Sequence, residues 1–132
     1  MRKVLTFGVF DALHRGHIRL LERAKQHGDY LIVAVQTDEN ILKYKPGTLI
    51  LNNTEERLYM VNSIRFVDEV ISYDDVDRAI QTLDFDVFVR GEDQNHAGFK
   101  KATDWCIEHG KEVVVLERTQ GISSTLIRQH NI

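Results

Sequence analysis

Five short apolar segments alternate with segments of helical periodicity, and this alternation limits the possible folds more than any other feature of the chain. The apolar segments, rich in Val, Ile, Leu and Phe as strands buried on both faces are, span residues 3–7, 30–36, 67–72, 86–90 and 112–117. Helical patterns span residues 17–27, 54–65, 75–83, 98–109 and 123–130. Thr54, followed by two glutamates, is typical of a helix N-cap. We expect an α/β fold: a five-stranded parallel sheet with helices on both faces and right-handed crossovers.

Length and composition favour a single globular domain, residues 1–132. Hydrophobic residues make up 42% of the chain and charged residues 28%, which is ordinary for a folded domain. A net charge of -3 offers no broad basic surface, so nucleic acid is not an expected partner. The single cysteine, Cys106, excludes an intrachain disulfide and a multi-cysteine zinc site.

The N-terminus shows no secretory signal, because Met1, Arg2 and Lys3 lead into only a short apolar segment. No apolar run approaches the length that crosses a bilayer. The sequence therefore predicts a cytoplasmic protein that does not insert into membranes.

Residues 8–17 directly follow the first apolar segment and read Gly-Val-Phe-Asp-Ala-Leu-His-Arg-Gly-His. At a strand-to-helix junction, free backbone N–H groups and the helix dipole favour an anion. We expect Gly8 to permit a tight turn and Gly16 to allow close backbone approach, with His14 and His17 at the anion. The other four histidines are interpreted as ordinary surface side chains; they are His27, His96, His109 and His130. The segment predicts a phosphate site.

The residues that follow each predicted strand meet at one edge, because ligands of open parallel sheets bind at the carboxyl ends of the strands. The segments concerned are 8–17, 37–45, 91–94 and 118–125. Neither Gly-x-Gly-x-x-Gly nor Gly-x-x-x-x-Gly-Lys-Ser/Thr occurs there, which argues against dinucleotide and P-loop sites. Residues 118–125 carry an arginine and several hydroxyls before a final helical pattern. They indicate either a solvated helix cap or a second helix N-terminus directed at the same anion.

Several stretches together resemble one family of nucleotidyltransferases. They are Gly-x-Phe-Asp-x-x-His-x-Gly-His at 8–17, the segments 20–25, 28–31 and 65–70, and Arg-Thr-x-Gly-Ile-Ser-Ser-Thr at 118–125. Over nearly the whole chain they are similar to the glycerol-3-phosphate cytidylyltransferases. The histidine motif alone is shared with enzymes that act on other phosphate esters, whereas the ending is typical of the cytidylyl branch. The resemblance implies a Rossmann-like sheet, a homodimer, and Mg²⁺ held mainly by the triphosphate.

The reaction that this resemblance implies is transfer of a cytidylyl group from CTP to a small phosphate monoester. With glycerol 3-phosphate as acceptor, the products are CDP-glycerol, for cell-envelope or capsule polymers, and pyrophosphate. A phosphate monoester is already ionised near neutral pH, so its oxygen attacks the α-phosphorus without a protein nucleophile. The enzyme brings two polyanions together and neutralises the developing charge.

The resemblance also implies roles for individual residues. The catalytic residues are His14, His17, Lys43 and Arg118. The nucleotide-binding residues are Phe7, Gly8, Val9, Phe10, Gly16, Arg65, Gly91, Asp93, Arg118, Thr119, Ile122, Ser123, Ser124 and Thr125, of which Gly91 and Asp93 lie near the base. The acceptor-binding residues are Asp11, Lys43, Lys45, Arg57 and Arg65; for the lysines, the alternative is a solvated charged loop. No residue is implied as a dedicated metal ligand.

Some positions depart from the family pattern. Arg15 replaces an aromatic residue, Glu92 replaces aspartate, Gln94 replaces tryptophan, and residues 44–53 do not match. These changes predict a more polar acceptor pocket, unless the Arg15 side chain simply points to solvent. Two further interpretations stay open. One is a cytidylyltransferase for another ester or an adenylyltransferase, and the other is a nucleotide-binding module without catalysis.

Overall fold

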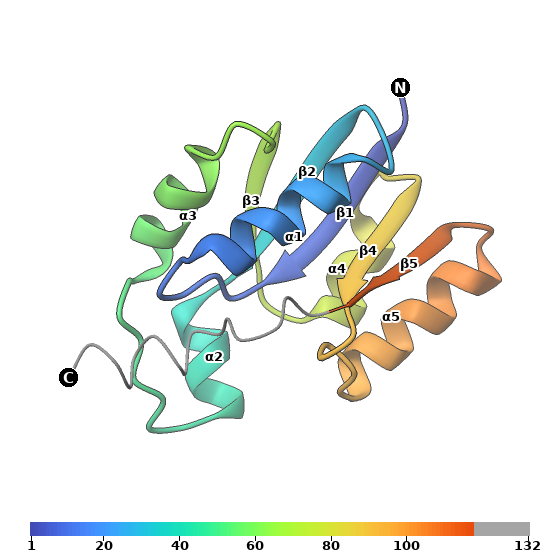
Figure 1. Ribbon diagram of the computed structural model, residues 1–132. Helices are drawn as coiled ribbons and strands as arrows, with labels where there is room; N and C mark the ends of the chain where they lie inside the picture. The colour runs from blue at the N-terminus through green and yellow to red at the C-terminus, as the bar shows by residue number, and fades with distance from the viewer. Residues whose placement is uncertain (118–132) are drawn as a thin grey trace.

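The described residues, 1–117 of this computed structural model, form one sheet of five parallel strands (Figure 1). The strands are β1 (Lys3–Gly8), β2 (Tyr30–Gln36), β3 (Glu69–Tyr73), β4 (Val87–Gly91) and β5 (Glu112–Leu116). Their order across the sheet is β3-β2-β1-β4-β5, and each neighbouring pair is parallel. The predicted parallel α/β sheet is confirmed. Strand order reverses between β1 and β4, the point at which such sheets bind ligands.

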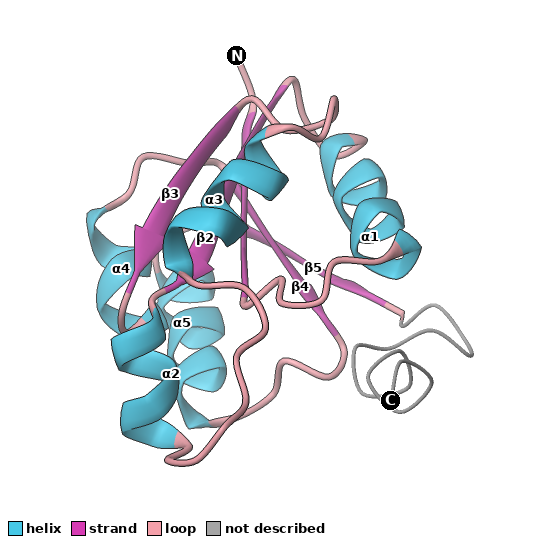
Figure 2. Ribbon diagram, turned by 90° about the vertical axis from the view of Figure 1, so that its left-hand side faces the viewer, coloured by secondary structure: helices cyan, strands magenta, loops and turns pink. Residues whose placement is uncertain are grey.

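Helices cover both faces of this sheet within the described part of the chain. They are α1 (Arg15–Lys25), α2 (Asp38–Tyr44), α3 (Thr54–Asn62), α4 (Val76–Thr82) and α5 (Ala97–Glu108). The buried side chains of α1 and α3 pack with Val4 on one face, and those of α4 and α5 pack with Leu5 on the other. Figure 2 shows α1 separated by the sheet from α4 and α5. No helix within residues 1–117 is long and apolar enough to cross a membrane.

The burial of each strand follows its place in the sheet. β1 and β2 lie inside the sheet, and all but their end residues are buried, which explains their continuous apolar sequence. β3 and β5 form the two edges, and in each only the last residue is buried, while the first four are partly or fully exposed. The three-layer packing therefore fixes the carboxyl ends of the strands, and with them the segments that carry the candidate site.

Several predicted boundaries were wrong by a few residues. The third strand begins at Glu69 rather than at residue 67, because the Asp68 carboxylate bonds the Leu31 N–H and pairs with Lys25. Helix α3 ends at Asn62 rather than at residue 65, and a tight turn follows. Its N-cap is Asn53, not Thr54. The helix predicted over 123–130 lies outside the described residues.

Helix α2 occupies residues for which the sequence predicts no helix. The Thr37 side chain accepts a hydrogen bond from the Asn40 N–H, and Asp38 and Glu39 fill the first turn. A threonine followed by two acidic residues also stands at residues 54–56, where the sequence predicts a helix start. The start of α2 was therefore visible in the sequence. The helical pattern of α2 is weak, because the helix has only seven residues and a proline and a glycine follow it.

Candidate active site

The connection from β1 to α1 is held in an unusual backbone conformation. Phe10 and Ala12 have φ values of 56° and 50°, a region that residues other than glycine seldom adopt. Strain of this kind is concentrated at functional sites. Gly8 itself has no positive φ. A Cβ at Gly8 would lie 2.6 Å from the Phe10 ring, and glycine is needed here for close packing.

His14 and His17 form a reciprocal cap at the start of α1. Nδ1 of His14 accepts a hydrogen bond from the Gly16 N–H at 3.0 Å, and Nδ1 of His17 accepts one from the His14 N–H at 3.2 Å. The two rings are stacked with their centroids 4.0 Å apart. Because Nδ1 accepts in both, each neutral ring carries its proton on Nε2. The cap therefore fixes two adjacent imidazoles as Nε2–H donors at a helix N-terminus.

Burial, followed by the neighbouring His14, lowers the pKa of His17 to about 4, while Asp11 opposes the shift. The His17 ring is thus neutral at physiological pH. It can donate a hydrogen bond from Nε2 but carries no positive charge.

This pKa gives a pH prediction. In imidazole ¹⁵N NMR, the ring of His17 should stay neutral from about pH 8 to pH 5. The unfolded chain takes up this proton near the ordinary value of 6.5 and the folded chain only near 4. Between these values the unfolded state binds more protons, so the free energy of unfolding should fall as the pH falls through this window. A His17 midpoint near 6.5 would contradict the assignment.

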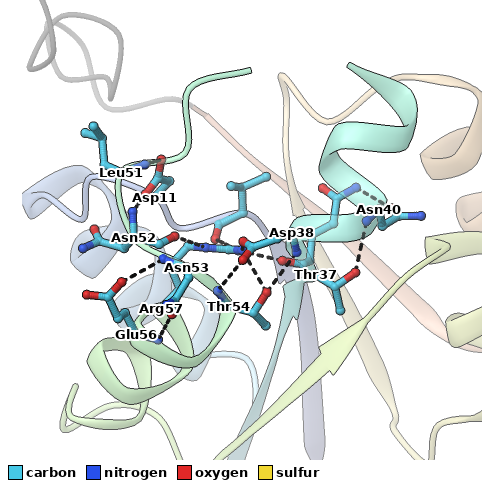
Figure 3. Close-up of polar contacts among 12 residues, drawn as sticks. Asp11, Thr37, Asp38, Asn40, Leu51, Asn52, Asn53, Thr54, Glu56 and Arg57 are labelled. Atoms are coloured by element: carbon cyan, nitrogen blue, oxygen red, sulfur yellow. Dashed lines mark hydrogen bonds and ion pairs between the residues drawn. The ribbon is translucent and has the colours of Figure 1, made fainter. Parts of the chain in front are cut away.

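Asp11 ties the β1–α1 connection to the segment before α3 (Figure 3). Its side chain is buried, and its two oxygens accept hydrogen bonds from the Leu51 and Asn52 N–H groups, both at 2.8 Å. Asp11 was predicted to bind the acceptor. In the structure its carboxylate positions residues 51–52 beside the histidine segment, and its contact with the acceptor stays a prediction.

Arg57 was also predicted to bind the acceptor, and the structure contradicts this. Its side chain is 0% exposed. Its guanidinium donates to the carbonyl oxygens of Asn52, Val9 and Gln36, to the Asp38 carboxylate and to the Thr54 hydroxyl (Figure 3). Arginine has five N–H donors, and all of them are in use. Arg57 therefore joins the carboxyl ends of β1 and β2 to α2 and α3, and leaves no donor for a phosphate.

Arg65 does not reach the site within one chain. It follows α3 and precedes β3, so it lies at the amino edge of the sheet, opposite the β1–α1 connection. Its side chain is exposed, and its guanidinium lies over the Phe66 ring at 5.2 Å. The helical pattern predicted over 54–65 includes both Arg57 and Arg65, but α3 ends at Asn62 and Arg65 lies beyond it.

Lys43 and Lys45 lie on the same edge of the sheet as the histidines. Lys43 is in the last turn of α2 and Lys45 is its C-cap, beyond the carboxyl end of β2. Both are exposed, and the Lys43 ammonium lies 5.4 Å from the Tyr44 ring centroid. Their phosphate contacts stay a prediction.

The turn after β4 lies on the other side of the strand-order reversal. Gly91 ends β4, and the exposed Glu92 and Asp93 follow it. The Gln94 amide bonds two main-chain groups, the Phe7 carbonyl and the Gly91 N–H. The sequence predicts that Gln94 makes the acceptor pocket more polar. In the structure, both ends of its amide bond the main chain instead. Local sequence does not indicate this bridge, because Gln94 and Phe7 are 87 residues apart in the chain.

The remaining predicted nucleotide contacts divide into three groups. The side chains of Phe7 and Phe10 belong to the buried core, so only their main chain is available to a ligand. Val9 is partly exposed, and Gly16 lies in the first turn of α1. The C-terminal group lies outside the described residues: Arg118, Thr119, Ile122, Ser123, Ser124 and Thr125. The described chain stops just beyond Leu116, which pairs with Gly91 at the same edge.

Comparison with known proteins agrees with this geometry. A family model described as cytidylyltransferase-like matches residues 5–130. The chain belongs to the cytidylyltransferase-like family. This cytidylyltransferase-like chain is 46% identical to the glycerol-3-phosphate cytidylyltransferase of Bacillus subtilis (strain 168), over 98% of the chain and 96% of that protein. It is 44% identical to the enzyme of the same name from Staphylococcus aureus, over 98% and 94%.

A solved structure supports the fold assignment. The lipopolysaccharide core biosynthesis protein from Thermoplasma volcanium GSS1 superimposes with a TM-score of 0.74 at 26% identity. The match covers 90% of this cytidylyltransferase-like chain and 97% of that one.

Proposed function

We propose that this protein transfers the cytidylyl group of CTP to glycerol 3-phosphate, releasing CDP-glycerol and pyrophosphate. The observation that carries the proposal is the His14–His17 pair, fixed as neutral Nε2–H donors at the N-terminus of α1. The pair follows β1, next to the strand-order reversal. Similarity to the two glycerol-3-phosphate cytidylyltransferases over nearly their whole length supports the choice of substrates.

In the proposed reaction, a phosphate oxygen of glycerol 3-phosphate attacks the α-phosphorus of CTP. A new P–O bond forms, the bond from the α-phosphorus to the bridging β-oxygen breaks, and pyrophosphate leaves with the electron pair. His14 and His17 donate hydrogen bonds to the phosphate oxygens on which charge grows. Lys43, Lys45 and Arg118 supply fixed positive charge, whereas Asp11 and Arg57 hold the surrounding segments in place.

Mg²⁺ belongs to this proposal as an ion carried by the triphosphate. Within residues 1–117 no three His, Cys, Asp or Glu side chains are grouped as a metal site. Magnesium in nucleotide sites commonly takes its ligands from phosphates and water, so it does not need a group of protein ligands. When bound, the ion would neutralise charge on the leaving pyrophosphate.

The proposal also covers the setting of the reaction. We place it in the cytoplasm, with CDP-glycerol consumed by transfer to an envelope or capsule polymer. The homodimer belongs to the same proposal, and sedimentation at assay concentrations tests it.

Nucleotide choice tests the cytidylyl assignment. Asp93, exposed in the turn after β4, is proposed to accept a hydrogen bond from the cytosine amino group. UTP has a carbonyl at that position and leaves an acceptor facing an acceptor, which costs about 1–3 kcal/mol. With glycerol 3-phosphate as acceptor, kcat/KM for CTP should exceed that for UTP by about 5- to 150-fold. Pyrophosphate release measures both; equal rates with ATP would favour an adenylyltransferase, and no release with any nucleotide would favour a binding module.

Acceptor choice tests the role of Arg15. This residue begins α1 directly after His14 and is exposed. If it faces the acceptor, Arg15→Trp should lower kcat/KM for an anionic ester such as 3-phosphoglycerate about threefold relative to glycerol 3-phosphate, as expected for one exposed ion pair. Arg19→Trp, at another exposed position of the same helix, is the matched control. An unchanged ranking of acceptors in Arg15→Trp would show that Arg15 points to solvent.

A further inference from the structure

The strands β1 and β4 separate toward their carboxyl ends. Their register contains only the pairs Val4–Val87 and Leu5–Phe88. On its other side, β1 stays paired with β2 as far as Gly8 and Val35. The main-chain groups of β1 and β4 beyond Leu5 therefore lack the regular ladder, at the place where the strand order reverses and a ligand is expected.

Gln94 spans this opening with its side chain. Its Nε2 donates to the Phe7 carbonyl at 2.7 Å, and its Oε1 accepts from the Gly91 N–H at 3.0 Å. Phe7 is near the end of β1 and Gly91 is the end of β4. One amide thus replaces the ladder bonds that are missing between the two strands, and fixes the distance between their ends.

Arg90 holds the same turn from within β4. Its Nη1 donates to the carbonyl oxygens of Gly91, at 3.3 Å, and of Gln94, at 3.1 Å. The turn is closed by the Gln94 N–H, which donates to the Gly91 carbonyl at 3.0 Å. Nε of Arg90 is buried and has no hydrogen-bond partner among the described residues. A buried unsatisfied donor is a cost that an apolar side chain would avoid, so a role other than packing stability explains the arginine better.

We infer that Gln94 and Arg90 are positioning residues that preorganise the opening between β1 and β4 for the nucleoside half of the nucleotide. This inference rests on the proposed function. The histidine cap provides the anion-binding half of the site at the end of β1, so the rest of the nucleotide must extend across the opening, over the turn at 91–94. A turn fixed before binding reduces the entropy lost on binding. Removing the bridge should weaken CTP binding without slowing cytidylyl transfer.

Gln94→Met tests this inference, because methionine has a similar length and makes neither hydrogen bond. We expect KM and Kd for CTP to rise about tenfold, as expected for two lost hydrogen bonds. We expect kcat at saturating CTP and KM for glycerol 3-phosphate to stay within about twofold. Gln81→Met is the matched control, because Gln81 is an exposed glutamine whose amide bonds a backbone carbonyl at the far end of α4. Its CTP affinity should be that of wild type.

Two more variants test the inference in case Gln94→Met does not fold. Gln94→Glu retains an acceptor for the Gly91 N–H but loses the donor to the Phe7 carbonyl, and Arg90→Lys keeps the charge but loses the guanidinium geometry. Each folded variant, verified by urea unfolding, should raise KM for CTP. Unchanged CTP affinity in every folded variant, or a fall in kcat with unchanged CTP affinity, overturns the inference alone. Absence of CTP-dependent pyrophosphate release by the wild-type protein overturns the proposed function instead.

Discussion

Replacing His14 by asparagine is expected to lower kcat about 10²–10³-fold while the protein stays folded. Asparagine is a good N-cap and can still accept the Gly16 N–H, so helix α1 should lose little stability. It cannot place a donor where Nε2 of the imidazole lies. Because the lost hydrogen bond acts on charge that grows in the transition state, kcat should fall far more than CTP binding weakens.

His96 supplies a matched control for this prediction. It caps α5 as His14 caps α1, with Nδ1 accepting the Gly98 N–H at 3.1 Å. His96→Asn makes the same chemical change at a helix cap and should leave kcat within about twofold. Turnover of His14→Asn within threefold of wild type, measured by pyrophosphate release at saturating CTP, would remove His14 from the chemistry.

Arg57→Met is expected to lower the free energy of unfolding by about 3–5 kcal/mol, because it removes a fully buried guanidinium whose five N–H groups are all hydrogen-bonded. The substitution leaves the Asp38 carboxylate without its buried partner. It also removes the donors to the carbonyls of Asn52, Val9 and Gln36, which lie in three separate segments. Urea unfolding monitored by circular dichroism measures the change.

Arg65→Met is the control for this prediction, because Arg65 is a second arginine that the family resemblance implies as acceptor-binding. Arg65 is exposed, so its replacement should change the free energy of unfolding by no more than about 0.5 kcal/mol. If Arg57 instead contacted the acceptor phosphate directly, Arg57→Met would keep its stability and raise only KM for glycerol 3-phosphate. That result would contradict the closed network around Arg57.

The sheet was predictable because its strands are read from local composition. β2 matched its predicted range, residues 30–36, since an inner strand is apolar along its whole length. The edges of elements were less predictable, because tertiary contacts set them. The Asp68 side chain, for example, bonds the Leu31 N–H and delays the start of β3.

In the candidate site too, features set by local sequence were predictable and features set by distant contacts were not. The place of His14 and His17 at a strand-to-helix junction was predicted, because their spacing and their position after a strand are visible in the sequence. Their contact with phosphate stays a prediction. The roles of Arg57 and Gln94 were not predicted, because each depends on main-chain groups far away in the chain. An arginine that binds phosphate and one that binds carbonyl oxygens look alike in a sequence, and only burial distinguishes them.

The most direct test of the account is ³¹P NMR of the purified protein with CTP, glycerol 3-phosphate and Mg²⁺. The account predicts that CTP is replaced by equal amounts of CDP-glycerol and pyrophosphate, and only when glycerol 3-phosphate is present. Pyrophosphate release without the ester, giving CMP, would show attack by water and contradict a site built to join two phosphates. Unchanged CTP in the presence of glycerol 3-phosphate would contradict the proposed reaction itself.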